Sequence, residues 1–265
     1  MNLEKICNQV IELSTEVATF ISKEFEQFDT DNIEYKGRND LVSYVDKEAE
    51  KRLVNQLEKI LPEAGFIAEE GSGSRNPKGY NWIVDPLDGT TNFIHGIPFF
   101  AISIALIKDD ELQLGVVYSV RQKECFHAVK GGKAYCNQQE ISVSKTQALN
   151  QGLLATGFPY ADFDDVSAYM KALEILMQKC HGLRRIGSAA LDLSYVAAGR
   201  FNAFFEYNLN SWDVAAGALI VQQAGGKVSD FNNGNDYVFG KQILAAASEN
   251  SQKEILEIVE KYLTK

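Results

Sequence analysis

The segment WIVDPLDGTTNF, residues 82–93, is the most informative part of the sequence. Its first three residues are apolar and typical of a buried strand, and two carboxylates, Asp85 and Asp88, follow three residues apart. Pro86 fixes its own φ angle, while Gly89 permits a positive φ and a close approach of a ligand to the backbone. We therefore expect the strand to end in a sharp turn at which both carboxylates face one point.

The residues after Asp88 also predict a place for an anion. The backbone amides of Gly89, Thr90 and Thr91 can surround a small anion, especially if a helical turn begins there and adds its dipole. The alternative is a solvated surface turn, because Asp-Pro-x-Asp-Gly favours turns by itself. Acidic residues elsewhere in the chain have to decide between the two interpretations.

Two other acidic residues stand at the ends of predicted elements. Glu69 follows a short predicted strand at residues 65–68, and Asp213 lies in the first turn of a predicted helix at residues 211–224. Taken separately, Glu69 can be a solvent-facing loop residue. The helix dipole alone can explain Asp213, since it favours an acid at a helix N-terminus. Each of them is a weak sign of function until it is combined with the others.

The rest of the chain predicts alternating helices and sheets. Apolar residues recur at helical spacing in two segments before Pro62, and residues 66–143 contain short apolar or β-branched runs that indicate a sheet. Further on, we expect helices near 164–180, 188–198 and 211–224, strands at 201–206, 226–230 and 242–247, and a last helix capped by Ser248. No linker interrupts the sequence. We expect a single domain of two packed lobes, residues 1–145 with helices and an antiparallel sheet, and residues 146–265 with helices and strands.

Composition excludes several classes of function. The chain has 265 residues, of which 36 are acidic and 26 basic, for a net charge of −10 that opposes general binding to nucleic acids or anionic membranes. The longest apolar stretch, residues 99–107, is much shorter than a membrane-spanning helix, which needs about 20 residues. The first residues of the chain lack a signal-peptide pattern. The four cysteines match neither a zinc motif nor a disulfide framework. We expect a cytoplasmic protein with no nucleic-acid or membrane partner.

Two segments, DPLDGTTNF at residues 85–93 and WDVAAG at residues 212–217, resemble the two signatures of the inositol monophosphatase family. The resemblance covers nearly the whole chain, from Lys36 and Asp46 to residues 224–226. It implies an α+β fold, a layered α/β/α/β/α sandwich of the inositol monophosphatase and fructose-1,6-bisphosphatase type. It also implies a homodimer that removes phosphate from small alcohols with magnesium and water.

The resemblance assigns metal ligands residue by residue. Glu69 and Asp85, with the Leu87 carbonyl, would bind a first Mg²⁺, and Asp85, Asp88 and Asp213 would bind a second. Glu69 can also serve a third ion, so two or three Mg²⁺ per site are expected. Such a set agrees with the chemistry of Mg²⁺, which prefers oxygen ligands, and is unattractive to zinc.

The resemblance also implies that Asp46, Thr90 and Glu69 take part in catalysis. Thr90, polarised by Asp46, would orient and help deprotonate the attacking water. Enzymes accelerate phosphate monoester hydrolysis by up to about 10²¹-fold, whereas general acid–base catalysis contributes typically ~10² to ~10⁴. Several positive charges must therefore converge on the phosphoryl group, and metal ions would supply them.

The expected substrate is a small phosphorylated polyol, with inositol monophosphate as the first choice. The residues that the resemblance places against it are Asp88, Gly89, Thr90, Ala189, Glu206 and Asp213. Glu206 can instead be a surface acid on an edge strand, and Lys36, at the expected entrance, can serve solubility only. Arg184 and Arg185 can meet a second anionic group, lie in a subunit contact, or belong to a solvated face.

Two classes of function stay open at this point. The first is the phosphatase, acting on inositol monophosphate or, alternatively, on fructose 1,6-bisphosphate, 3′-phosphoadenosine 5′-phosphate or NADP. The second is a non-catalytic, metal-binding regulatory protein that retains the fold, and it predicts a disrupted set of acids. The continuation at residues 91–93 is more similar to the inositol phosphatase branch than to the relatives that act on adenosine bisphosphate.

Overall fold

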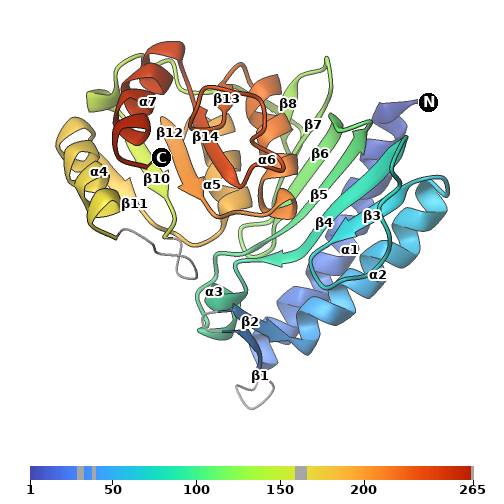
Figure 1. Cartoon of the computed structure of the whole chain (residues 1–265). Helices are drawn as coiled ribbons and strands as arrows, with labels where there is room; N and C mark the ends of the chain where they lie inside the picture. The colour runs from blue at the N-terminus through green and yellow to red at the C-terminus, as the bar shows by residue number, and fades with distance from the viewer. Residues whose placement is uncertain (29–32, 38–39, 159–165, 264–265) are drawn as a thin grey trace.

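Helices and sheets alternate in five layers across the molecule (Figure 1). A computed structural model describes residues 1–28, 33–37, 40–158 and 166–263, with the backbone alone for residues 33–37 and 40–42. The layers are, in order, helices α1 (Leu3–Gln27) and α2 (Tyr44–Ile60), a seven-stranded sheet, helices α5 (Ala189–Ala197) and α6 (Ser211–Gln223), a five-stranded sheet, and helices α4 (Val166–Lys179) and α7 (Glu249–Leu263). The predicted α+β, five-layered fold is confirmed.

The seven-stranded sheet has the spatial order β3-β4-β5-β6-β7-β8-β9. Its strands are β3 (Gly65–Ala68), β4 (Tyr80–Asp88), β5 (Ala101–Lys108), β6 (Glu111–Ser119), β7 (Glu124–Val129), β8 (Ala134–Cys136) and β9 (Gln139–Ile141). All neighbours are antiparallel except β3 and β4, which are parallel and differ from the antiparallel sheet expected from the sequence. The reason is that residues 69–79 return along the sheet before β4 begins, so both strands run the same way.

The five-stranded sheet has the order β11-β10-β12-β14-β13. Its strands are β10 (Leu153–Thr156), β11 (Gly182–Arg184), β12 (Ala203–Tyr207), β13 (Lys227–Ser229) and β14 (Gln242–Ala246). The last three agree with the predicted strands, whereas β10 and β11 are too short and too irregular in pattern to have been predicted. The sheets lie on either side of residue 145, and the division of the chain into two lobes there stays a prediction.

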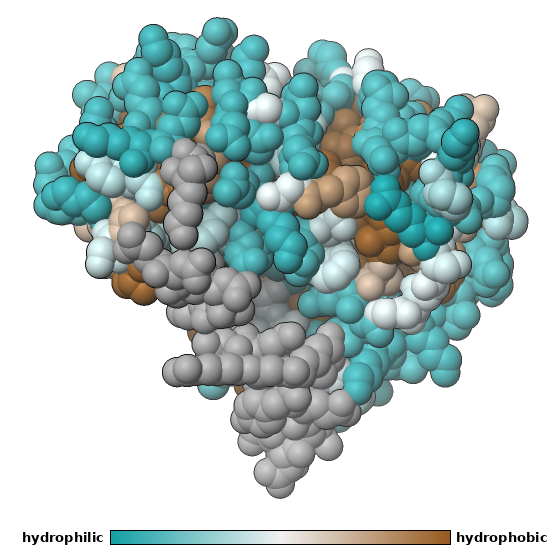
Figure 2. Space-filling view, in the orientation of Figure 1, coloured by the Kyte–Doolittle hydropathy of each residue, from teal (hydrophilic) through white to brown (hydrophobic). Residues whose placement is uncertain are grey.

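The remaining elements are short. Strands β1 (Ile33–Gly37) and β2 (Asp40–Ser43) pair antiparallel ahead of α2, helix α3 (Thr90–Ile94) follows β4, and a 3₁₀ turn spans Leu149–Gln151. No helix in the described part of the chain is both long and apolar enough to span a bilayer. Most of the face seen in Figure 2 is hydrophilic, as expected for a chain whose apolar side chains are buried between the layers.

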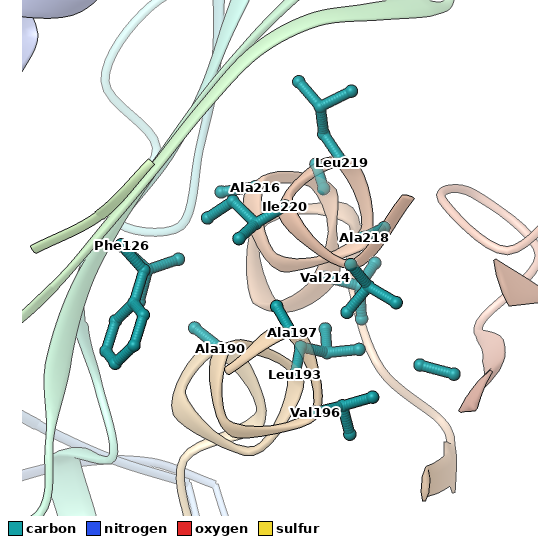
Figure 3. Packing of buried hydrophobic residues seen from close by; sticks show 14 of the residues in the cluster. Phe126, Ala190, Leu193, Val196, Ala197, Val214, Ala216, Ala218, Leu219 and Ile220 are labelled. Carbon is teal, nitrogen blue, oxygen red and sulfur yellow. The ribbon is translucent and has the colours of Figure 1, made fainter. Parts of the chain in front are cut away.

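Helices α5 and α6 form the central layer, and small residues let them approach each other and both sheets. Figure 3 shows alanines and branched aliphatic side chains of the two helices facing one another, with Phe126 of the seven-stranded sheet beside them. A Cβ on Gly217 of α6 would lie 2.6 Å from the Cβ of Leu193 on α5, and a Cβ on Gly115 of β6 would lie 2.6 Å from the Ala216 carbonyl oxygen. Close packing on two sides therefore fixes the position of α6, whose first turn carries Asp213.

Candidate active site

A pocket of about 210 Å³ opens where the ends of several elements meet. It lies at the C-terminal ends of β3, β4, β10 and β12 and at the N-terminal ends of α3, α5 and α6. The predicted site residues that line it are Glu69, Asp85, Leu87, Asp88, Gly89, Thr90, Ala189, Glu206 and Asp213. Asp46 reaches the pocket through Thr90, and the side chain of Lys36 lies outside the described residues.

A bulge in β4 brings Asp85 and Asp88 to the same side of the strand. Residues three apart on a regular strand point to opposite faces. Here Asp85 pairs with Ser103 and Asp88 with Ala101, so three residue steps on β4 match two on β5. The strand continues through Pro86, which corrects the prediction that a sharp turn holds both acids.

The turn comes one residue after the second acid. Gly89 has a φ of +97°, and helix α3 begins at Thr90 with a hydrogen bond from the Phe93 amide to the Gly89 carbonyl. A Cβ on Gly89 would also lie 3.1 Å from the Phe99 carbonyl oxygen, so both the φ angle and the space favour glycine. The helical turn that would add its dipole to the amides after Asp88 is therefore present.

Three aspartates meet at the centre of the pocket. One carboxylate oxygen from each of Asp85, Asp88 and Asp213 lies within 4.8 Å of the other two. Each side chain is oriented by protein donors: the Leu87 amide donates to Asp85 Oδ1 (2.9 Å), and the Asn210 amide donates to Asp213 Oδ2 (2.6 Å).

Asp88 is held from the opposite side of the pocket. Its Oδ2 accepts hydrogen bonds from the Ser188 hydroxyl (2.6 Å) and the Ala190 amide (2.8 Å) at the start of α5. These contacts join the end of β4 to α5, whereas Asp213 comes from α6. The three carboxylates are therefore positioned by separate elements, and packing of the central layer sets the distances between them.

Glu69 joins this group because β3 and β4 are parallel. Ala68 pairs with Val84, the Glu69 amide donates to the Val84 carbonyl (3.3 Å), and the side chains of Glu69 and Asp85 share a hydrogen bond. Burial, followed by the charge of Asp213, raises the pKa of Glu69 to about 8. Two acids this close can share a proton, and a divalent cation can take its place.

Burial raises the pKa of the other acids in the group as well. The pKa of Asp88 is raised to about 6 despite the hydrogen bond from Ser188. The pKa values of Asp85 and Asp213 lie well above the usual range, first because of burial and then because of the neighbouring carboxylates. The fold thus concentrates negative charge that a cation would stabilise.

Thr90 and Asp46 form a hydrogen-bonded pair at the edge of the pocket. The Thr90 hydroxyl donates to Asp46 Oδ1 (2.8 Å) and lies 3.0 Å from the Leu87 carbonyl oxygen. Asp46 is fully buried on α2, and its Oδ2 accepts from the amide (2.9 Å) and hydroxyl (2.6 Å) of Ser43. A hydroxyl that donates to a carboxylate keeps its lone pairs free to accept a proton from a water molecule.

The far side of the pocket contains acids around one arginine. Glu206 and Asp192 both line it beside Arg185, and burial raises the pKa of Glu206 to about 8. Asp192 is 1% exposed, and its Oδ1 has no hydrogen-bond partner within the described structure. A Cβ on Gly157 would lie 1.9 Å from Glu206 Oε1, so only glycine leaves room for this carboxylate.

Sequence reasoning did not find all of these residues. Asp192 could have been noticed as the one charged residue of helix α5 (Ala189–Ala197), whereas Gly157 follows a strand that was not predicted. Of the two arginines, Arg185 lines the pocket, while Arg184 is an exposed residue of β11.

The oxygen atoms that the pocket offers as metal ligands suit a hard cation. Its lining supplies carboxylates, hydroxyls and backbone carbonyls, and among the described residues no cysteine or histidine lines it. Oxygen donors of this kind are the ligands that Mg²⁺ prefers. The residues present therefore fit magnesium.

A layered α+β fold with an acidic, oxygen-lined pocket that could bind a metal ion is compatible with a phosphatase. The model of the inositol monophosphatase family matches residues 2–264, and the chain belongs to this family. It is 41% identical to an inositol-1-monophosphatase of Caulobacter vibrioides, over 94% of this chain and 98% of that one. It is 38% identical to the Nus factor SuhB of Pseudomonas aeruginosa, over 98% of both chains.

Among solved structures, the extragenic suppressor protein SuhB of Bartonella henselae is similar along nearly the whole chain. The TM-score is 0.90 at 38% sequence identity, with 96% of this chain and 98% of that chain covered. The order and packing of the five layers are therefore shared with that crystal structure.

The raised pKa values predict how stability depends on pH when divalent ions are removed. The folded-state pKa of Glu69 and of Glu206 is about 8 against an ordinary 4.5, so the folded state favours the neutral acids. Their contribution to the free energy of unfolding is complete below pH 4.5 and is lost as the pH rises through about 8. In EDTA, we expect the melting temperature to fall by at least roughly 5 °C between about pH 5 and pH 8.5, which corresponds to about 2 kcal/mol.

Magnesium should change this dependence, because cation binding replaces protons on the acids. The rise in melting temperature that millimolar Mg²⁺ produces should be larger at the upper end of the pH range than at the lower end. Scanning calorimetry at several pH values, with EDTA or with Mg²⁺, measures both effects. A melting temperature in EDTA that stays constant or increases over this range would contradict the charge assignment.

Proposed function

We propose that this protein is a Mg²⁺-dependent phosphomonoesterase that hydrolyses inositol monophosphate to inositol and phosphate. The observation that carries the proposal is the meeting of Asp85, Asp88 and Asp213 beside the hydroxyl of Thr90, which Asp46 holds. Family membership supports the phosphatase class. The relatives named inositol-1-monophosphatase support the choice of substrate.

Magnesium would be held by Glu69, Asp85, the Leu87 carbonyl, Asp88 and Asp213. When bound, two or three Mg²⁺ would supply positive charge that stabilises the phosphoryl group in the transition state and lowers the pKa of water. The hydrogen bonds that orient each aspartate prepare these ligands before a cation arrives.

The protein's own residues would then direct the proton. The Thr90 hydroxyl donates to Asp46, so its oxygen can accept a proton from the attacking water while its own proton moves toward the carboxylate. Glu69, next to Asp85, would help to orient the same water. The new bond forms between the water oxygen and phosphorus, the ester P–O bond breaks, and the departing alcohol oxygen gains a proton from solvent, to which Asp46 returns the proton that came from the attacking water.

The far side of the pocket would bind the alcohol. One guanidinium, that of Arg185, faces three carboxyl groups, those of Asp88, Asp192 and Glu206. This side of the pocket therefore has more hydrogen-bond acceptors than donors. Hydroxyl groups can donate to these carboxylates, whereas a second phosphate would add repulsion. This balance favours a monophosphorylated polyol over fructose 1,6-bisphosphate, 3′-phosphoadenosine 5′-phosphate or NADP.

Relatives under two names, inositol-1-monophosphatase and Nus factor SuhB, match almost the whole chain. A non-catalytic regulatory protein predicts a disrupted set of acids, and the clustering of Asp85, Asp88 and Asp213 favours catalysis instead. The homodimer and the cytoplasmic location implied at the outset belong to the same proposal.

A panel of phosphate esters tests this function. With Mg²⁺ present, kcat/KM for inositol monophosphate should exceed the value for each of the three alternative substrates by at least ~10-fold, which corresponds to about 1.4 kcal/mol. EDTA should abolish phosphate release. The Asp88→Asn variant, purified in parallel, serves as the blank for contaminating phosphatases. A preference for another ester would overturn the substrate, and the absence of Mg²⁺-dependent turnover on every ester would support the non-catalytic alternative.

A further inference from the structure

Glu50 is a fully buried acid to which the proposed chemistry assigns no role. It lies on α2 among apolar residues, with Ala49 and Leu53 beside it at 0% exposure. Its Oε2 accepts a hydrogen bond from the amide of Glu70 (2.7 Å), and its Oε1 accepts one from the amide of Ser72 (2.9 Å). Burial of a carboxylate is costly unless donors compensate for the lost water. Both oxygens of Glu50 are therefore used to hold a distant segment of backbone.

That segment is the start of the connection between β3 and β4. Glu70 directly follows Glu69, the proposed metal ligand, and the chain turns away at Gly71, whose φ is +88°. On the sheet side, the Glu69 amide donates to the Val84 carbonyl at 3.3 Å. On the side of helix α2, the Glu50 carboxylate accepts hydrogen bonds from the amides of Glu70 and Ser72. The backbone carrying Glu69 is thus fixed between the sheet and helix α2.

The same helix also positions Thr90. Asp46 lies four residues before Glu50, so the two acids occupy one face of α2, a turn apart. Asp46 accepts the Thr90 hydroxyl, and Glu50 accepts the amides after Glu69. One rigid helix, packed on the seven-stranded sheet, therefore sets where two separate parts of the site stand relative to each other (Figure 1).

We propose that Glu50 is a positioning residue whose carboxylate holds the Glu69 backbone in place and thereby sets the affinity of the site for Mg²⁺. This rests on the proposed function in taking Mg²⁺ as the cation and Glu69 as one of its ligands. A carboxylate is required because a glutamine offers one acceptor oxygen and would turn an NH₂ group toward the other amide. An aspartate keeps two carboxyl oxygens but is shorter by one methylene, so it cannot reach both amides.

The experiment compares Glu50→Gln and Glu50→Asp with Glu58→Gln, which makes the same chemical change at an exposed position of the same helix. Calorimetric titration with Mg²⁺ alone should show a dissociation constant about 10-fold higher for both Glu50 variants and unchanged for the control. The Mg²⁺ concentration for half-maximal phosphate release should rise by a similar factor. The KM for the ester at saturating Mg²⁺ should change much less, because the alcohol side of the pocket is untouched.

Hydrogen exchange gives a second readout, and in the parent protein it needs no variant. In the parent protein the amides of Glu70 and Ser72 should exchange slowly although Gly71, Gly73 and Ser74 are exposed, and in folded Glu50→Gln they should exchange faster. Rapid exchange of both amides in the parent would overturn the proposal even if the variants do not fold. So would a folded Glu50→Gln that binds Mg²⁺ as the parent does. A parent that binds Mg²⁺ but hydrolyses no ester would refute the proposed function while the titration still decides the role of Glu50.

Discussion

Replacement of Asp85 by asparagine should lower kcat/KM for Mg²⁺-dependent phosphate release by at least ~10³-fold, which corresponds to about 4 kcal/mol of transition-state stabilisation. Asp85 stands between Glu69, with which it shares a hydrogen bond, and the group formed with Asp88 and Asp213. It is the one acid proposed as a ligand of both the first and the second Mg²⁺. An amide keeps the acceptor for the Leu87 amide but removes the charge, so the fold should be retained while cation binding fails.

Stability measurements separate this explanation from misfolding. Burial and neighbouring charges raise the pKa of Asp85 well above its usual range, so Asp85→Asn should melt no lower than the parent in EDTA. A cation at 100 times its dissociation constant stabilises the parent by about 2.7 kcal/mol, and most of this gain should be lost in the variant. Asp110→Asn, at an exposed position with a positive φ of 65°, is the matched control and should behave as the parent. An active Asp85→Asn, or one that Mg²⁺ still stabilises fully, would refute the metal assignment.

Removal of the Thr90 hydroxyl should produce the second largest effect. In Thr90→Ala we expect kcat to fall by ~10² to ~10⁴, the range of general acid–base catalysis, because the oxygen that accepts a proton from water is lost. Thr90→Ser keeps the hydroxyl within reach of Asp46 and should retain most of the activity. Single-turnover phosphate release at saturating Mg²⁺ isolates the chemical step.

The Mg²⁺ dependence of the same variants provides the control. Thr90 supplies no proposed metal ligand, so the dissociation constant for Mg²⁺ should stay close to that of the parent in both variants. If Thr90→Ala keeps a kcat within about 10-fold of the parent, the hydroxyl is not the proton acceptor. Equal losses in Thr90→Ser and Thr90→Ala would indicate that the methyl group, through packing, matters more than the hydroxyl.

Much of the fold could be predicted because its signals are local. The amphipathic pattern of α1 and α2, the apolar run that becomes β5, and the capping residue Ser248, whose hydroxyl accepts the Ser251 amide, depend on neighbours a few residues away. By contrast, β10 and β11 have three or four residues each and are held as strands by β12 and by each other. Their pairing partners are remote in sequence, so their own residues do not reveal them.

The identity of the acids was readable from the sequence alone, as was their place at the ends of predicted elements. Their meeting was decided by three features of the tertiary structure. Parallel pairing of β3 and β4 brings Glu69 beside Asp85, the bulge in β4 turns Asp88 to the same side, and the packing of α6 carries Asp213 to both. Short-range preferences are encoded in a few adjacent residues, whereas strand direction, bulges and helix packing minimise the free energy of the whole chain. Composition and motifs therefore determined which groups could bind a cation, and only the folded layers decided that carboxylate oxygens of Asp85, Asp88 and Asp213 lie within 4.8 Å of one another.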